Sequence, residues 1–485
     1  MLVLGGCASS AGIGPAATAL APQQLGLPDP ALAPAPAPLA ADWWQDFGDA
    51  NLTALVERAL AGNPGLKVAQ ARIARAEAGV ASQQASACPL VFGAADVTRE
   101  RFSANSIYPP PLGGSIRTLA SAQVGAILEF DFFGLHSAAL AAALGTQRAA
   151  QAEAQAARVV LASSVVRGYV QLGRLQAQRE VNERALKQRD ETLQIIRQRV
   201  QGGLDTSVEL RQGEGALPES RLQIEQIDEQ MAWTRHALAA LTGQAPDALD
   251  GLSAPLRAVQ LAALPAALPA DLLGRRADIT AARWRIEAAS GDTQAAKAAF
   301  YPNLNLSAFI GLSSMGLDRL LRSGSEQYGI GPAIHLPIFD AGRLRANLRA
   351  KTAELDAAVE TYNAAVIEAV HEAADQISSV RAVARQQAEQ AQAQAAAEAA
   401  YDLATQRYKA GLSTYLVVLV AENSVLNQRH AAVDLKARAL DAQVGLVRAL
   451  GGGYAADQQV GGGYAADQRV GEGYAADRAP TLAVR

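Results

Sequence analysis

The stretch RVQGGLDT at residues 199–206 returns as RYKAGLST at residues 407–414, and this recurrence organises the chain. The shared positions are Arg199, Gly203, Leu204 and Thr206 in the first copy and Arg407, Gly411, Leu412 and Thr414 in the second. The two copies lie 208 residues apart, and the same offset relates Gly134 to Gly342. A constant offset indicates an internal duplication, so both halves should contain the same sequence of helices and strands.

A long helix is predicted before each copy of the motif. Residues 135–201 and 341–410 contain no proline, and at roughly 1.5 Å per residue either run would form a helix about 100 Å long. Leu186, Leu193 and Val200 recur at every seventh position, which is the spacing of a coiled-coil seam. The glycines of the repeated motif should end these helices, and a shorter helix should return from each turn.

Alternating apolar and polar residues predict four strands. The alternation is clear at residues 123–132, 303–312 and 328–338, and it is weakest at residues 89–102. These runs match the roughly 9–11 residues that a tilted strand needs to cross a bilayer, whereas no stretch reaches the roughly 18 apolar residues of a transmembrane helix. A soluble antiparallel sheet with one wet face would show the same alternation.

The number of strands limits the assembly, if the strands lie in a membrane. Four strands cannot close a barrel, and an open edge is not tolerated in lipid. Two chains would form an eight-stranded barrel filled by its own side chains, whereas three chains would give twelve strands and leave room for a pore. We therefore predict an α+β membrane protein. It should be a trimeric, twelve-stranded transmembrane β-barrel with four strands per chain, continued by a long α-helical coiled-coil barrel.

Composition argues against an enzyme, a metalloprotein and a nucleic-acid-binding protein. The net charge is −4, and the basic residues are scattered among acids rather than clustered. The five histidines and two cysteines form no metal-binding pattern, and the chain has no phosphate-binding loop or nucleophile elbow. We therefore expect no catalytic residue, metal, cofactor or nucleic-acid partner.

The first residues resemble an export signal. Leu4-Gly5-Gly6-Cys7 matches a lipobox, in which the cysteine thiol receives a diacylglycerol after cleavage. Residues 1–6 would then be a truncated signal peptide, because they lack a basic region and a full apolar region. Either the true start lies upstream or the match is a coincidence. Lipidation of Cys7 is the prediction, with the Pro/Ala-rich residues 7–41 as a tether to the membrane.

The remaining chain divides into three parts. We predict a first structural repeat at residues 42–250 and a second at residues 251–450, each with a helix, two strands and a long helical hairpin. Residues 451–485 contain three copies of a decapeptide, GGGYAADQQV, GGGYAADQRV and GEGYAADRAP. Their glycine-rich, charged composition predicts a disordered tail.

Several motifs together resemble the outer membrane factors of the TolC superfamily, and above all the lipoprotein branch typified by OprM and NodT. The motifs are Asp42-Trp43-Trp44-x-x-Phe47-x-Asp49, Leu273-Gly274-Arg275-Arg276-Ala277-Asp278-Ile279, Ala299-Phe300-Tyr301-Pro302, Leu336-Pro337-Ile338-Phe339-Asp340-x-Gly342 and Arg407-Tyr408-x-x-Gly411. The resemblance extends from Cys7 to about Gly451. One departure is Ala277, where the family usually has proline.

The resemblance implies a passive exit channel in the outer membrane of a Gram-negative bacterium. Such a channel is a lipid-anchored homotrimer that extends into the periplasm and docks to a periplasmic adaptor. With an inner-membrane pump, typically of the resistance-nodulation-division class, it exports drugs and small toxic compounds. Two alternatives stay open. One is export of protein, peptide or polysaccharide on the same architecture, and the other is a cytoplasmic structural coiled coil.

The resemblance also suggests functional residues at the periplasmic tip. The turns at Gly203, Leu204, Thr206, Gly411, Leu412 and Thr414 would contact the adaptor, and Glu209, Val417, Val420 and Glu422 would line the aperture. The family pattern has aspartate at the places of Val417 and Val420, so this chain departs from it. A threefold ring of valines would close the pore by apolar contact and dewetting. Ordinary coiled-coil packing of both valines is the alternative interpretation.

Overall fold

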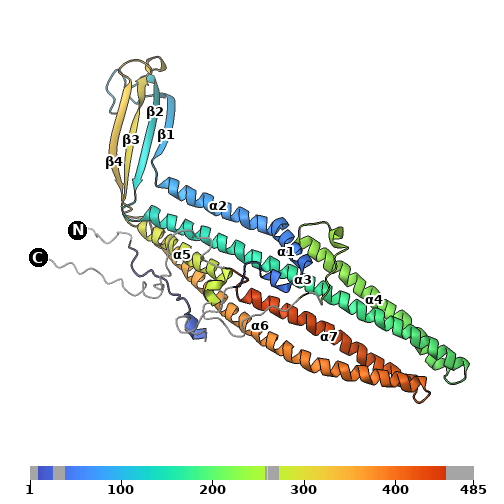
Figure 1. Ribbon diagram of the computed structural model, residues 1–485. Coiled ribbons are helices and arrows are strands. Elements are labelled where there is room, and N and C mark those ends of the chain that lie inside the picture. The colour runs from blue at the N-terminus through green and yellow to red at the C-terminus, as the bar shows by residue number, and fades with distance from the viewer. Residues whose placement is uncertain (1–8, 26–38, 257–258, 260–271, 455–485) are drawn as a thin grey trace. The chain divides into compact units, whose positions relative to one another are not determined.

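The computed structural model describes residues 9–25, 39–256, 259 and 272–454, and Figure 1 shows how its elements are arranged. The lipidation site Cys7 and tail residues 455–485 lie outside the described residues. The longer elements are α1 (Ala50–Gly62), α2 (Pro64–Ser86), β1 (Leu90–Arg101), β2 (Ile116–Phe130), α3 (Leu135–Gln201), α4 (Ser207–Leu241), α5 (Ala277–Ala298), β3 (Asn303–Met315), β4 (Glu326–His335), α6 (Arg343–Lys409) and α7 (Tyr415–Ala449). Short 3₁₀ turns join several of them.

The predicted long helices are confirmed, and their lengths repeat. Helices α3 and α6 have 67 residues each, and α4 and α7 have 35 each. Helix α6 begins 208 residues after α3 (343 against 135), and α7 begins 208 residues after α4 (415 against 207). The offset found between single residues therefore also relates whole helices.

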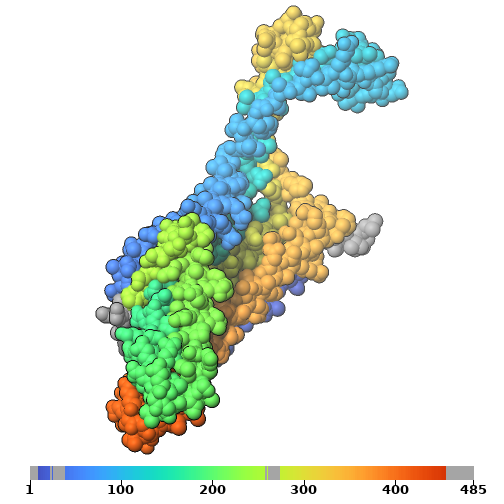
Figure 2. All heavy atoms as spheres, turned by 90° about the vertical axis from the view of Figure 1, so that its right-hand side faces the viewer, coloured from blue at the N-terminus to red at the C-terminus, as the bar shows by residue number. Residues whose placement is uncertain are grey.

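The two helical hairpins, α3–α4 and α6–α7, lie side by side. Helix α3 packs on α4 and also on α7, while α6 packs on α7. Figures 1 and 2 both show the green α3–α4 hairpin ending beside the orange and red α6–α7 hairpin. The two copies of the repeated motif, which stand at these ends, are therefore brought together.

The four strands form one antiparallel sheet in the order β1-β2-β3-β4. Each half contributes two neighbouring strands, and β2 of the first half pairs with β3 of the second. Within the described residues, β1 and β4 each pair on one side only. The sheet therefore has two edges whose backbone groups could accept further strands.

Two strand boundaries differ from the prediction. Strand β2 begins at Ile116 rather than near residue 123, because it pairs with β1 over its whole length up to Arg101. Strand β4 ends at His335 rather than near residue 338, because its neighbour β3 begins opposite it at Asn303. The side-chain alternation marked the strands, but pairing partners set their ends.

The main hydrophobic core lies among the helices and begins with the tryptophan motif. Trp43, Trp44 and Phe47 are buried together with side chains of α1 and α3. The hydroxyl of Tyr169 on α3 donates a hydrogen bond to Asp49 Oδ2 at 2.9 Å, and Oδ1 of Asp49 accepts from the backbone of Asn51 at 2.8 Å. Asp49 thus caps α1 and fixes it against α3.

Residues 9–25, part of the predicted tether, follow α6. Asp356 accepts hydrogen bonds from the backbone of Ala16 and Ala17 at 2.9 and 3.0 Å. Asn363 accepts one from the backbone of Leu20 at 2.8 Å and donates one to the carbonyl of Thr18 at 3.0 Å. This segment, which we call the strap, is therefore held along α6 by side chains that bind its backbone.

The described helices offer no membrane span by themselves. None of them is both long enough and apolar enough to cross a bilayer. Across the same residues, no three His, Cys, Asp or Glu side chains gather as metal ligands. Cys88, at the end of the first helical stretch, is an exposed free thiol.

A candidate gate at the paired hairpin turns

The two hairpin turns have the same backbone. Gly203 and Gly411 have φ angles of +69° and +75°, in the left-handed region that glycine adopts without strain. The backbone of Leu204 donates to the carbonyl of Arg199 at 2.8 Å, and Leu412 donates to Arg407 at 2.8 Å. This pattern is a Schellman motif, in which a left-handed glycine ends a helix and satisfies its last carbonyls.

The helices that leave the turns are capped differently. Thr206 begins α4 with a capping box: its hydroxyl accepts from the backbone of Val208 at 3.2 Å, and its own backbone donates to Glu209 at 2.9 Å. The bonds from Thr206 lower the pKa of Glu209. Thr414 makes no such side-chain bond at the start of α7. The position that corresponds to Glu209 after the offset is Val417, which cannot complete a capping box.

A cluster of three side chains joins the two turns. Arg199 forms a two-pronged ion pair with Asp205, with Nε–Oδ2 at 2.9 Å and Nη2–Oδ1 at 3.1 Å. Its Nη1 also donates to the carbonyl of Tyr408 at 3.2 Å, and its guanidinium lies 4.6 Å from the centre of that ring. The Tyr408 hydroxyl completes the cluster by donating to Asp205 Oδ2 at 2.5 Å.

The charges of this cluster support one another. Arg199 holds the pKa of Asp205 below its usual value, although burial opposes the shift. Burial and the neighbouring Asp205 carboxylate raise the pKa of Tyr408, so its hydroxyl stays protonated and can donate. A hydrogen bond from a neutral donor to a carboxylate is stronger than a hydrogen bond between two neutral groups. The cluster therefore links the second turn to the first through a charge-assisted contact.

A second contact between the hairpins is buried. Arg189 on α3 contacts Glu422 on α7, with Nε–Oε1 at 3.0 Å, and also donates to Ser220 on α4 at 2.9 Å. Burial raises the pKa of Glu422, and the ion pair with Arg189 offsets only part of that shift. Glu422 is 6% exposed. Its carboxylate therefore lies between helices in this chain, not on the exposed surface expected of an aperture residue.

Val417 and Val420 lie on the surface of the chain. They are 50% and 63% exposed, whereas Val418 between them is 2% exposed and belongs to the core at the tip. Within the described chain, Val418 rather than Val417 or Val420 fills the packing position of the hairpin. The exposed pair is available for contacts with other chains, and its role as an apolar ring stays a prediction.

The sequence reasoning missed the residues that join the turns. It used Arg199 and Tyr408 only as motif positions and gave no role to Asp205 or Arg189. A signal was present, since the two copies differ where these contacts are made. Asp205 corresponds to Ser413, and Tyr408 corresponds to Val200. Differences between otherwise equal repeats can thus point to contacts that cross from one half to the other.

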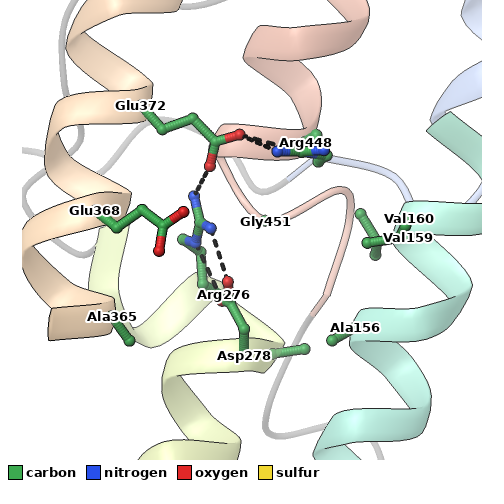
Figure 3. A pocket seen from close by; sticks show the side chains of 11 residues that line it. Ala156, Val159, Val160, Arg276, Asp278, Ala365, Glu368, Glu372, Arg448 and Gly451 are labelled. Atoms are coloured by element: carbon green, nitrogen blue, oxygen red, sulfur yellow. Dashed lines mark hydrogen bonds and ion pairs between the residues drawn. The ribbon is translucent and has the colours of Figure 1, made fainter. Parts of the chain in front are cut away.

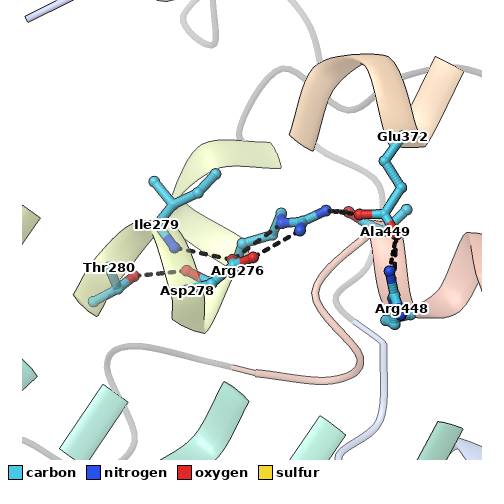
Figure 4. A network of polar contacts seen from close by, with 7 residues as sticks. All are labelled: Arg276, Asp278, Ile279, Thr280, Glu372, Arg448 and Ala449. Carbon is cyan, nitrogen blue, oxygen red and sulfur yellow. Dashed lines mark hydrogen bonds and ion pairs between the residues drawn. The ribbon is translucent and has the colours of Figure 1, made fainter. Parts of the chain in front are cut away.

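A separate polar cluster surrounds Arg276 at the start of α5. Its Nη1 donates to Glu372 on α6 at 2.9 Å and to the carbonyl of Ala449 at the end of α7 at 3.1 Å, while Nη2 donates to Asp278 at 2.7 Å. Figure 4 shows Glu372 shared with Arg448. Burial would raise the pKa of Glu372, but the two arginines hold it below its usual value.

This cluster has a structural role. Figure 3 shows the cavity beside it, with Val159 and Val160 of α3 on the wall opposite Arg276. Arg276 is already engaged by two carboxylates and a carbonyl, which satisfies a buried guanidinium. The Arg-Arg-x-Asp motif of the sequence therefore fastens α5 to both helices of the second hairpin.

Comparison with known proteins agrees with this architecture. The family model described as "Outer membrane efflux protein" matches residues 55–244 and 268–452, one match in each half. The putative multidrug resistance outer membrane protein MdtQ of Escherichia coli K12 is 33% identical over 424 residues, covering 85% of this chain and 88% of that protein. The pyoverdine export outer membrane protein OpmQ of Pseudomonas aeruginosa is 31% identical, covering 86% and 88%.

A solved structure shares the fold. The outer membrane protein VceC of Vibrio cholerae superimposes with a TM-score of 0.81 at 37% identity, covering 86% of this chain and 99% of that one. The resemblance first carried by the Trp43-Trp44, Arg276 and Gly411 motifs is confirmed by these matches. The chain is an efflux protein of the outer membrane with the TolC fold, and it belongs to the outer membrane efflux protein family of the TolC superfamily.

Proposed function

We propose that this chain forms the trimeric exit channel of a tripartite efflux pump. The observation that carries the proposal is the open sheet, in which four strands leave both edges unpaired within the described residues. A lipid environment requires those edges to be closed, and three copies supply the twelve strands of a barrel with a lumen. The 67-residue helices would then form a tunnel about 100 Å long.

Small compounds are the favoured cargo. Relatives that share most of the chain's length are named for multidrug resistance and for export of pyoverdine. Among the residues that the structure describes, no feature favours protein, peptide or polysaccharide as cargo instead. The partners in this proposal are a periplasmic adaptor and an inner-membrane pump of the resistance-nodulation-division class.

The hairpin turns are the proposed adaptor site. Leu204 and Leu412 occupy equal positions in the two Schellman motifs, and each is 70% exposed. Three chains would present six such leucines in a ring, which offers an apolar patch for a partner helix or hairpin. The threonines Thr206 and Thr414 would flank that patch.

Val417 and Val420 are proposed to close the tip by apolar contact. Val417→Asp would place three carboxylates in a narrow ring, where like charges repel and attract counter-ions. Conductance in planar bilayers should rise and become sensitive to millimolar divalent cations. Val68→Asp, at a similarly exposed valine on α2, is the control and should change neither property. Strong divalent block of the unmodified channel would contradict the apolar closure and point to an acid such as Glu209.

The amino-terminal anchor is a further part of the proposal. The strap reaches the first turn of α6, where Arg345 donates to the carbonyls of Ser9 and Ala11. Cys7 stands only two residues before Ser9. A diacylglycerol on Cys7 would therefore enter lipid close to where β4 gives way to α6. Mass spectrometry of the mature protein, expressed from an upstream start, should find the lipid, and an unmodified thiol would refute this part.

Two measurements test the channel itself. The mass in mild detergent, with bound detergent subtracted, should equal three chains, and a uniform monomer or dimer would refute the trimer. Deleting the gene should raise the accumulation of amphiphilic dyes in cells, and the plasmid-borne gene should restore efflux. Normal dye efflux together with loss of a secreted peptide or polysaccharide would instead support the other cargo class.

A further inference from the structure

The two faces of the four-stranded sheet differ in polarity. Side chains alternate between the faces along each strand, and residues paired across neighbouring strands share a face. One face is mostly apolar and carries Val91, Val124, Leu128, Leu306, Ile310 and Ile330. The other carries the polar side chains of Asp96, Ser121, Gln123, Glu129, Asn305 and Gln327. In the proposed barrel the first is the lipid face and the second is the lumen face.

Two phenylalanines interrupt the polar character of the lumen face at one level of the sheet. Phe92 on β1 stands opposite Gly125 on β2, and Gly125 in turn stands opposite Phe309 on β3. Phe309 completes the row opposite Gly329 on β4, so phenylalanine and glycine alternate across the four strands drawn side by side in Figure 1. The lumen face of the described strands carries no other Phe, Tyr or Trp.

Each phenylalanine ring covers a neighbouring glycine. A methyl group on Gly125 would lie 2.6 Å from Phe92 Cζ and 3.0 Å from both Cε1 and Cε2, so it would meet the face of that ring. A methyl group on Gly329 would lie 2.7 and 2.9 Å from Cε1 and Cζ of Phe309. The missing Cβ atoms therefore make room for rings that lie along the sheet. The opposite face of each ring is turned to the lumen, and Phe92 and Phe309 are 39% and 41% exposed.

We propose that the Phe92 and Phe309 rings are stacking platforms in the lumen for flat aromatic cargo, above all for aromatic cations. This inference rests on the proposed trimeric barrel and names a class of cargo for it. Three copies would present six such rings, two from each sheet. The face of a phenyl ring attracts another aromatic ring in offset or edge-to-face contact, and its negative charge density attracts a cation.

Acids on the lumen face favour positively charged cargo. Asp96 lies four residues after Phe92 on β1, and Glu129 lies four residues after the covered glycine on β2. At roughly 3.3 Å per residue, each carboxylate stands about 13 Å along its strand from the row of rings. The lumen face of the described strands carries three acids, Asp96, Glu100 and Glu129, against one arginine, Arg117. A surplus of negative charge in an enclosed passage raises the local concentration of cations.

Current blocks in single channels test the platform. In a planar bilayer, the unmodified protein should show reversible blocks when millimolar ethidium, a flat aromatic cation, is added on the barrel side. Tetraethylammonium, a cation without a ring, should give blocks at least about threefold shorter. The double variant Phe92→Leu with Phe309→Leu should shorten the ethidium blocks at least about threefold and leave the tetraethylammonium blocks unchanged.

Two further variants are the controls. Phe130→Leu removes a ring that is also 39% exposed but lies on the lipid face of β2, so the ethidium blocks should keep their length. Phe92→Tyr with Phe309→Tyr keeps both rings and should keep the long ethidium blocks. Shorter blocks in Phe130→Leu than in the leucine double variant would contradict the assignment of the rings to the lumen.

The outcomes separate the platform from the channel on which it rests. A conducting trimer in which ethidium and tetraethylammonium blocks last equally long would overturn the platform alone. That comparison uses the unmodified protein, so it decides the matter even when the leucine double variant fails to assemble. Ethidium blocks of unchanged length in an assembled but less stable leucine variant would reduce the rings to a structural cover for the glycines. A monomeric mass in detergent without conductance would instead remove the proposed channel.

Discussion

The two hairpin tips have the same backbone turn but differ in the contacts that hold it. At the first tip, Thr206 and Glu209 cap α4, and Asp205 binds Arg199. At the second tip, Thr414 has no side-chain cap, and the hydroxyl of Ser413 is buried without a hydrogen-bond partner in the described chain. The second tip is held mainly by Tyr408 and Glu422, which reach across to the first.

This difference shows which features a duplication preserves. The left-handed glycine is needed wherever a helix ends in this turn, so it stands in both copies. A helix cap or an ion pair contributes only about a few kcal/mol to the free energy of unfolding. It can therefore be lost in one copy of the repeat when the other copy supplies a contact. The first hairpin is therefore a stable support, and the second depends on it for its position. Substitutions at corresponding positions of the two hairpins can test that dependence.

The largest loss of stability should follow from breaking the buried ion pair between Arg189 and Glu422. Glu422→Ala leaves Arg189 buried without its carboxylate, and losing one partner of such a pair costs about 3–5 kcal/mol. The corresponding position of the first hairpin is Glu214, which pairs with the exposed Arg211 at 2.8 Å. Glu214→Ala should cost about 0–1 kcal/mol. Denaturant unfolding of both variants in the same detergent measures the difference, and equal losses would contradict it.

A smaller effect is expected at the contact between the turns. Tyr408→Phe removes the hydroxyl that donates to Asp205, a bond to a charged group worth about 1.5–3 kcal/mol. The closed tip should loosen, and single-channel conductance should rise. Tyr415→Phe is the control, because the Tyr415 ring lies 5.9 Å from that of Tyr408 but its hydroxyl makes no hydrogen bond among the described residues. If both variants conduct alike, the hydroxyl does not hold the turns together.

The difference in capping between the two helices should change the free energy of unfolding by about 1 kcal/mol. Thr206→Ala removes the cap of α4 and should destabilise the protein by about that amount. Thr414→Ala at the corresponding position should be close to neutral, because the Thr414 side chain caps nothing. Unfolding midpoints of the two variants give the comparison directly. A loss at Thr414 as large as that at Thr206 would show that the two helix starts are equivalent after all.

The smallest effect on stability near neutral pH should come from the titration of two acids at the tip, Asp205 and Glu422. The sign of the effect differs between them. The pKa of Asp205 is lowered, so its stabilising contribution persists above 3.8 and is lost as the pH falls through the folded-state value. The pKa of Glu422 is raised, so its ionisation removes stability as the pH rises from 4.5 through its folded-state value. Melting temperatures of Asp205→Asn and Glu422→Gln against pH should therefore diverge from the unmodified protein in opposite directions.

The sequence predicted the helices and turns well because their causes are local. Absence of proline, heptad spacing and the Gly203 and Gly411 signals each act within a few residues, and both long helices were confirmed within two residues of their ends. The strand ends were less accurate, because pairing with distant residues sets them. The ion pair between Arg189 and Glu422 joins residues 233 positions apart, and periodicity carries no information about such a contact.

The placement of Glu422 shows this limit most clearly. Its position close after Val417 and Val420 in the sequence placed it among the predicted aperture residues. Its place on α7 turns it toward α3, where Arg189 neutralises its charge. A helix carries successive side chains to different faces, so residues close in sequence can have unrelated environments.

The strap also determines the order in which the protein can mature. Leu20 binds Asn363, a residue 343 positions later in the chain, and Ala16 binds Asp356 at a similar separation. A contact of such long sequence separation cannot form until the later partner has been made and folded, and closing it is entropically slow. Although it is synthesised early, the strap is therefore among the last segments to be fixed on α6.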